Sequence, residues 1–170
     1  MNEAQLFVDT VIAARTAWQA AVDQIPITAW GQPGFCGNWS LKDVVVHIAW
    51  YEREMIHLLE TRRFEGSELW KLPTDERNAQ IYLLTKDQPL TQVLASAIIT
   101  YKQLLSLLQQ ISTAELLDPA TFAGMPLEWT PQQILAGSTH RHYDEHRQQA
   151  EVWVKNHPFS ETYSNPSMTD

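Results

Sequence analysis

At residues 139–149 the chain reads Thr139-His140-Arg141-His142-Tyr143-Asp144-Glu145-His146-Arg147-Gln148-Gln149. We place it in a long helix predicted for residues 131–155, because Thr130-Pro131 supplies an N-cap followed by proline at the first helical position. His142 and His146 are four residues apart, which stacks two side chains on one helical face. The same stripe carries Leu135, Ser138, Thr139, Gln149 and Trp153. The two histidines are therefore expected to face the protein interior and to form part of a metal site.

Two helical histidines make an incomplete site, because zinc and its first-row neighbours normally take at least three protein ligands when a position stays open for water or substrate. His47 is the natural third ligand. It shares one side of a helix predicted for residues 41–63 with Val44, Tyr51, Glu54, Met55 and Leu58. Glu54, Asp144 and Glu145 are candidates to hydrogen-bond to the metal-ligating histidines and orient them. His57, His140 and His157 are not expected to be metal ligands. The alternative is three histidines that are hydrogen-bonded inside the core without metal.

Helical periodicity dominates the remaining sequence and predicts an all-α fold. Apolar residues recur at helical spacing over residues 3–24, 41–63, 90–111 and 131–155. A shorter helix is predicted for residues 73–84, within a connection long enough to let the second and third long helices run in the same direction. Segments 27–38 and 112–128 are interpreted as loops, since they are rich in turn residues. The prediction is a four-helix bundle with a long crossover between helices two and three.

Length and composition limit the classes of function. The chain has 170 residues and a formal net charge of −8, and 44% of its residues are hydrophobic. This length suits one domain, which we predict over residues 1–156, followed by a poorly ordered tail over residues 157–170. The negative charge disfavours nucleic-acid binding, and no apolar run approaches the roughly 18 to 20 residues of a membrane span. The lone Cys36 excludes an internal disulfide, so we expect a soluble, cytoplasmic protein.

Two motifs carry a resemblance to a known family. Asn38-Trp39-Ser40-Leu41-Lys42-Asp43-Val44-Val45-Val46-His47-Ile48-Ala49-Trp50 resembles the second-helix signature of the DinB-like superfamily, and residues 142–149 resemble its final H-x-x-x-H signature. The resemblance implies a four-helix bundle with a crossover, and a triad at His47, His142 and His146 that binds a divalent metal such as nickel or zinc. Asn78-Ala79-Gln80-Ile81-Tyr82 also resembles the branch that contains the ClbS/DfsB-type proteins.

The resemblance leaves the reaction open. Characterised relatives in this superfamily include isomerases and transferases that use mycothiol, bacillithiol or glutathione, and other members are stress proteins. One hypothesis is therefore a metal-dependent transferase, isomerase or hydrolase that activates a low-molecular-weight thiol or a water for attack on a small electrophile. The other is a stress or resistance protein that binds or sequesters a small molecule without catalysis.

Imidazole ligands favour zinc, nickel, copper or iron over magnesium and calcium, and acidification near pH 6.5 is expected to release the metal. Four aromatic residues are candidates for a substrate pocket, although each can equally be a core or loop-packing residue: Trp39, Trp50, Trp129 and Tyr143. The resemblance and the seven tryptophans also predict a homodimer.

Overall fold

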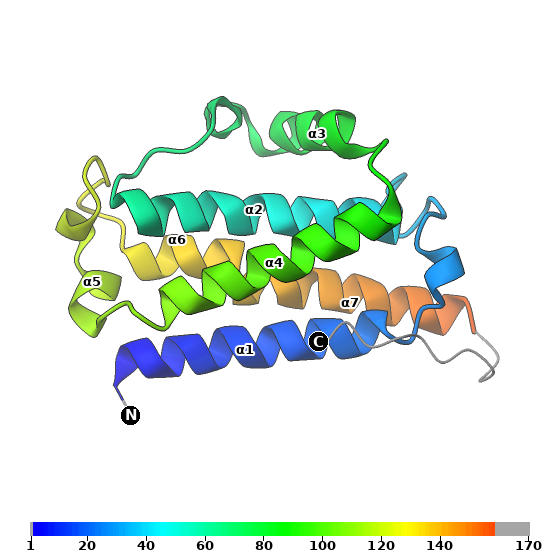
Figure 1. Cartoon of the computed structure of the whole chain (residues 1–170), viewed down its shortest axis with the longest axis horizontal. Coiled ribbons are helices and arrows are strands. Elements are labelled where there is room, and N and C mark those ends of the chain that lie inside the picture. Colours follow the sequence, from blue (N-terminus) through cyan, green and yellow to red (C-terminus); the bar gives the residue numbers. More distant parts are fainter. Residues whose placement is uncertain (1, 159–170) are drawn as a thin grey trace.

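Four long helical segments lie side by side in the computed structural model, which describes residues 2–158 (Figure 1). They are α1 (Glu3–Val22), α2 (Leu41–Thr61), α4 (Leu90–Leu108) and the pair α6 (Pro131–Ser138) and α7 (His140–Asn156). Short helices lie in the connections: η1 (Ile27–Ala29), η2 (Glu68–Lys71), α3 (Thr74–Thr85), α5 (Thr113–Leu117) and η3 (Pro119–Thr121). The predicted all-α bundle is confirmed.

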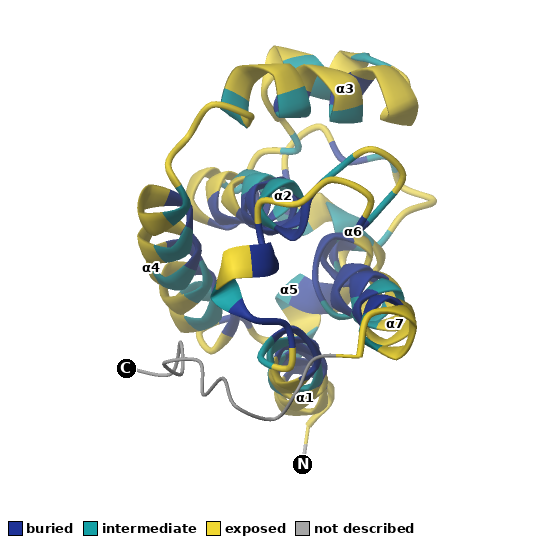
Figure 2. Ribbon diagram, turned by 90° about the vertical axis from the view of Figure 1, so that its right-hand side faces the viewer, coloured by how far each residue is buried: buried dark blue, intermediate teal, exposed yellow. Residues whose placement is uncertain are grey.

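The long helices pack in pairs, α2 against α4 and α1 against α7. Figure 2 shows that their buried faces point toward one another, while α3 stands outside the bundle and is largely exposed. Each helix buries the apolar stripe that its sequence predicts, and the stripes meet in one core that includes the fully enclosed Trp18, Leu104 and Leu135. Within the described residues, no helix is long and apolar enough to cross a membrane.

The second long helix begins where its sequence signals predict. Ser40 and Asp43 form a reciprocal capping box: the Asp43 backbone N–H donates to Ser40 Oγ over 3.3 Å, and the Ser40 backbone N–H donates to Asp43 Oδ2 over 2.9 Å. The helix ends at Arg62, whose φ of 55° is left-handed. The Ser40 cap lies seven residues before His47, and by fixing the start of α2 it sets the face on which that histidine lies.

The connection from α2 to α4 is the expected long crossover. It contains η2 and α3, and it brings the chain back to the end of the bundle at which α2 began (Figure 1). As a result α2 and α4 run in the same direction, antiparallel to α1 and α7. Only Arg77 and Ile81 of α3 are buried, so the crossover is attached to the bundle by few side chains.

The last long helix is not continuous, and the prediction of one helix over residues 131–155 was wrong at Thr139. Thr139 has φ −126° and ψ −107°, which ends α6 and begins α7. Its hydroxyl donates to the Leu135 carbonyl over 2.6 Å, and its backbone N–H bonds to Ala136 instead of continuing the α-helical ladder. Ser and Thr side chains compete with the backbone in this way, and Gly137 and Ser138 add little helix propensity.

The segment predicted as a loop over residues 112–128 also contains structure. Ser112 and Glu115 form a capping box that opens α5, and Leu116 on that short helix is fully buried. The S-x-x-E signal was present in the sequence, but one buried leucine gives no periodicity to detect. At the other end of the chain, most of the predicted tail lies outside the described residues; His157 stacks on Trp153 with ring centroids 3.9 Å apart.

Candidate metal centre

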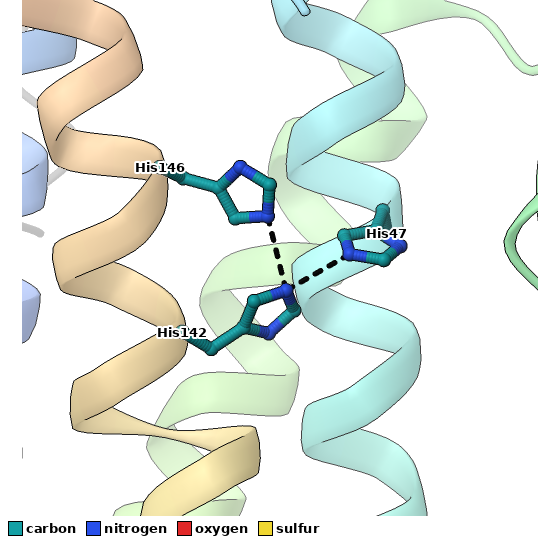
Figure 3. A group of neighbouring side chains, drawn as sticks. All are labelled: His47, His142 and His146. Atoms are coloured by element: carbon teal, nitrogen blue, oxygen red, sulfur yellow. Dashed lines mark hydrogen bonds between the residues drawn. The ribbon is translucent and has the colours of Figure 1, made fainter. Parts of the chain in front are cut away.

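His47 on α2 and His142 and His146 on α7 come together inside the bundle (Figure 3). All three side chains are buried. The Nε2 atom of His142 lies 2.8 Å from that of His47 and 3.0 Å from that of His146. The four-residue spacing on α7 stacks two of the rings, and the packing of α2 beside α7 presents the third. One nitrogen from each ring therefore points at a common centre.

The separations of these nitrogens fit a first-row metal ion. Metal–imidazole bonds are about 2.0–2.1 Å long, so two nitrogens bound to one ion stand about 2.9 Å apart at a right angle and about 3.4 Å apart at a tetrahedral angle. The observed separations of 2.8 Å and 3.0 Å match the shorter of these values. Three neutral nitrogen donors also match the preference of zinc, nickel, copper and iron for imidazole.

Hydrogen bonds among the three imidazoles cannot pair all of their Nε2 atoms well. The Gln149 Oε1 atom lies 2.7 Å from His146 Nδ1 and can only accept, so His146 carries its proton there and presents a lone pair at Nε2. A proton on His142 Nε2 can then serve His146 or His47, but one N–H cannot serve both well. A cation accepts all three lone pairs at once. The Nδ1 atoms of His47 and His142 have no hydrogen-bond partner.

Burial keeps the three imidazoles in the neutral form that a metal needs. Burial, with smaller contributions from the neighbouring histidines and, for His47, from Arg77, lowers the pKa of His47 to about 3 and that of His142 to about 2. Burial also lowers the pKa of His146, although its hydrogen bond to Gln149 acts in the opposite direction. At neutral pH the cluster is therefore a set of lone-pair donors and not a set of cations.

The histidines form part of the wall of a cavity of about 1020 Å³. The cavity lies between the bundle and the crossover, and its wall is shared among α2, α3, α6, α7 and the loops beside them. Trp39 and Trp129, two of the aromatic residues chosen from the sequence, line it. The volume of the cavity is at the upper end of the range for small-molecule sites. Because the histidines form part of its wall, a ligand in the cavity can reach one face of the cluster.

The other two aromatic residues chosen from the sequence, Trp50 and Tyr143, do not line this cavity. Trp50 packs on Trp70, with ring centroids 5.8 Å apart, and is not part of the cavity wall. Tyr143 is fully buried in the core, where its hydroxyl donates to Glu52 Oε1 over 2.7 Å. Tyr143 follows His142 directly and so lies on another face of α7, as helical geometry requires.

Sequence reasoning missed the contribution of the crossover to the cavity. Tyr51 lines it beside the histidines, and from the crossover come Trp70, Arg77 and Asn78. The Tyr51 hydroxyl donates to Asn78 Oδ1 over 3.0 Å, which joins α2 to α3 at the cavity wall. The Asn78-containing motif was the only sequence signal for this contact, and it gave no indication of which way α3 faces the bundle.

The acidic candidates do not hold the histidines. Glu54 lines the cavity, but its Oε2 atom accepts from the Ser67 backbone N–H at 2.9 Å and from Trp70 Nε1 at 2.6 Å, so it fastens the crossover. Asp144 pairs with Arg147, and Glu145 lies exposed at the cavity wall. The residue that does orient one of the three histidines is Gln149, whose side chain contacts His146 Nδ1.

The remaining histidines and the cysteine stand apart from the cluster. His57 is exposed, and His140 packs edge-on against Phe7 with ring centroids 5.4 Å apart. His157 stacks on Trp153 near the end of α7. Cys36 lines the cavity, but burial raises the pKa of its thiol, which disfavours the reactive thiolate.

Comparison with known proteins gives a consistent assignment. The family model of the DinB superfamily matches residues 10–150. The structure titled "Sibling Lethal Factor Precursor - DfsB" has a TM-score of 0.69 and 14% identity, covering 94% of this chain and 99% of that chain. A protein from Streptococcus pneumoniae has a TM-score of 0.74 and 10% identity, covering 91% of this chain and 92% of its own.

An uncharacterised protein from Escherichia coli UTI89 has a TM-score of 0.66 and 13% identity, covering 93% of this chain and 94% of its own. At these identities the likeness shows a shared fold. No curated protein matches the chain by sequence.

Proposed function

Since the chain belongs to the DinB superfamily, we propose that it is a metal-dependent enzyme whose ligands are His47, His142 and His146. The observation that carries this proposal is the convergence of three buried, neutral Nε2 atoms on one point in the wall of a ligand-sized cavity. Zinc and nickel are the proposed ions, with iron and copper as alternatives. A bound ion would supply Lewis-acid chemistry, lowering the pKa of a coordinated water or thiol so that it becomes a nucleophile near neutral pH.

The residues of the chain divide the remaining tasks. The three neutral imidazoles contribute no negative charge, so they leave the charge of a divalent ion available to a bound ligand. Gln149 fixes the proton of His146 on Nδ1. Trp39 packs edge-on against His47, with ring centroids 5.3 Å apart, and forms an apolar wall next to it. The proposed substrate is a small electrophile with an apolar body, attacked by the sulfur of a low-molecular-weight thiol or by water.

Elemental analysis of untagged protein tests the metal site. Wild type is expected to carry close to one equivalent of zinc or nickel, and His142→Ala and His146→Ala to lose it. His57→Ala is the matched control, because His57 lies on α2 but is exposed. The metal site is refuted if wild type and His146→Ala carry the same metal, or if His57→Ala loses as much as His142→Ala. A metal-free wild type would leave the histidines as hydrogen-bonded core residues.

Turnover assays test the chemistry separately. Metal-loaded protein is incubated with mycothiol, bacillithiol or glutathione and a model electrophile, and the consumption of thiol is followed with time. A metal-dependent rate that His146→Ala abolishes supports the thiol reaction. If no thiol is consumed, the hydrolytic reaction is the one left to test, by following loss of the electrophile in water.

The second candidate is a protein that binds or sequesters a small molecule in the same cavity. It is favoured by the size of the cavity, which is enough to enclose a whole ligand, and by its aromatic wall. The two functions differ in the response to His146→Ala: an enzyme loses its rate, whereas a binding protein only loses affinity.

Self-association as a homodimer is a further proposal that rests on the resemblance to the family. The tryptophans give it little support, since of the seven only Trp129 is exposed and the other six are buried or half-buried. Exposed apolar side chains such as Leu6, Ile99 and Val152 lie on different helices. Sedimentation that finds only monomer at micromolar concentration would refute the dimer.

A further inference from the structure

Arg77 is a buried cation in the wall of the cavity. It lies in the first turn of α3, and only 7% of its surface is exposed. Its guanidinium carbon lies 4.3 Å from the centre of the Trp70 ring and 5.8 Å from that of Tyr51. Stacking on aromatic faces stabilises a guanidinium and leaves its N–H edge free to donate in the plane.

Few protein groups use that edge. Arg77 Nη2 donates to Thr74 Oγ1 over 3.2 Å, while Nε is buried without a hydrogen-bond partner. Among the ion pairs of the described residues, none involves Arg77. Arg62 differs in this respect: it also stacks on a ring, that of Phe122, but it pairs with Glu115 at 3.0 Å. A buried cation without a counter-charge is costly, and a bound anion would offset that cost.

The carboxylates of the cavity wall do not supply the counter-charge. Glu54 accepts hydrogen bonds from Ser67 and Trp70, and Glu65 pairs with Arg63. The other two, Asp75 and Glu145, are exposed. They add negative charge to the accessible part of the wall, and this charge disfavours a ligand with several negative groups more than a ligand with one.

Tyr51 links this arginine to the metal centre. Its ring contacts the Arg77 guanidinium on one side, and it packs edge-on against His47 and His142, with ring centroids 4.9 Å and 5.0 Å apart. One aromatic ring therefore separates the cation from two of the three imidazoles. A ligand in the cavity can contact both Arg77 and the histidine centre.

We propose that Arg77 binds the carboxylate of the cavity's ligand, and that this ligand is an apolar or aromatic monocarboxylate. The planar guanidinium matches a carboxylate through paired N–H donors, and the aromatic wall around it suits an apolar body. The inference rests on the proposed function only in treating the cavity as the substrate site; anion binding at Arg77 needs no metal. The competing explanation is that Arg77 only fastens α3 to the bundle by stacking.

Fluorine NMR with a matched pair of probes tests the inference. Metal-free protein is titrated with 4-fluorobenzoate and with the neutral 4-fluorobenzamide at low ionic strength and pH 7.5. Wild type is expected to bind the benzoate, and Arg77→Met to weaken that binding about tenfold while leaving the benzamide unchanged, as for the loss of one charged hydrogen-bonding group. Arg62→Met is the control, since Arg62 stacks on a ring outside the cavity wall.

Two further measurements keep the outcome decisive. If Arg77→Met does not fold, Arg77→Lys is used instead, because lysine keeps the positive charge but lacks the planar pair of N–H donors. The guanidinium NMR signals of wild-type Arg77 report carboxylate binding directly. The proposal is overturned if metal-free wild type binds no benzoate at 20 mM, or if Arg77→Met weakens both probes equally. His146→Ala is expected to lose metal and still bind benzoate, so failure of the metal site and failure of the anion site are distinguishable.

Discussion

Gln149 is the residue that decides which nitrogen of His146 is available, because its amide oxygen accepts from Nδ1 at 2.7 Å. Partners of this kind typically change metal affinity by about 10- to 100-fold. We predict that Gln149→Ala weakens zinc binding about tenfold or more, as measured by competition with a chromogenic chelator. Gln148→Ala is the control, since Gln148 is exposed on the same helix. Equal affinities for the two variants would show that the contact does not orient the ligand.

The buried histidines make the stability of the metal-free protein depend on pH. In the unfolded chain they bind protons below about pH 6.5, whereas in the folded protein the pKa of His47 is about 3 and that of His142 about 2. The unfolded state therefore takes up more protons as the pH falls. Unfolding free energy should drop below pH 6.5 by up to about 1.4 kcal/mol per pH unit for each histidine.

Urea unfolding of metal-free protein at pH 7, 6 and 5 measures this slope, and His47→Gln should reduce it. An unchanged slope in the variant would contradict the assignment of the effect to His47.

The lowered pKa values also change the pH at which protons are expected to displace a metal from the histidines. That pH lies below the range near pH 6.5 that the sequence alone predicts.

At the scale of single residues, sequence reasoning found what depends on local spacing. His142 and His146 are paired by helical periodicity, and His47 follows from its position on the inner stripe of α2. Gln149 was placed on the ligand stripe but not recognised as a partner, because side-chain rotamers are set by packing. Arg77 was missed altogether, since its burial depends on how the crossover lies on α2.

Three helices are joined in the core by a buried charge network on Glu52. Glu52 Oε1 accepts from Arg15 Nη1 of α1 at 3.3 Å and from the Tyr143 hydroxyl of α7 at 2.7 Å. Burial raises the pKa of the Glu52 carboxyl and of the Tyr143 phenol, which reflects the cost of enclosing charge there. The network positions α7 through the residue next to His142.

We predict that Glu52→Ala destabilises the protein by about 3–5 kcal/mol, because it leaves the Arg15 guanidinium buried without its partner. Removing both charges as Arg15→Met with Glu52→Leu should recover most of that loss. Unfolding of both variants and wild type in guanidinium chloride measures the two effects. If the double variant is as unstable as Glu52→Ala, the loss is due to packing and not to an unpaired charge.

At the scale of helices, the sequence predicted helix positions well where the apolar stripe is long. It failed where a single residue interrupts a helix. The stripes of α1, α2 and α4 and the Ser40 capping box gave their positions. The break at Thr139 depends on a single hydroxyl bonding to the Leu135 carbonyl, and threonine makes that bond in many unbroken helices as well. The break ends α6 at Ser138 and starts α7 at His140, two residues before His142.

The proposed metal site would couple ion binding to the stability of the whole bundle, because its histidines come from α2 and α7, which are far apart in sequence. An ion that binds only the folded state at 100 times its dissociation constant adds about 2.7 kcal/mol. For a chain of this length we predict a rise in Tm of about 5–10 °C on adding zinc. Differential scanning calorimetry measures it, and His146→Ala should show no rise; an equal rise in that variant would mean that zinc acts elsewhere.

For the whole molecule, the all-α bundle and its crossover could be predicted from the sequence because four amphipathic stripes leave few ways to enclose a core. The cavity could not. Its wall combines side chains from α2, α3, α6 and α7, and no periodicity links residues such as Tyr51 and Asn78 across those elements.

The weak attachment of α3 to the bundle has a consequence for how such proteins diversify. The crossover buries little of its own surface, with Ile81 as its one fully enclosed apolar side chain, yet it supplies Trp70, Arg77 and Asn78 to the cavity. Substitutions there change the ligand-facing wall at small cost to folding, while the histidines stay fixed on α2 and α7. Ligand specificity can therefore evolve through the crossover while the histidines of the proposed metal site are kept.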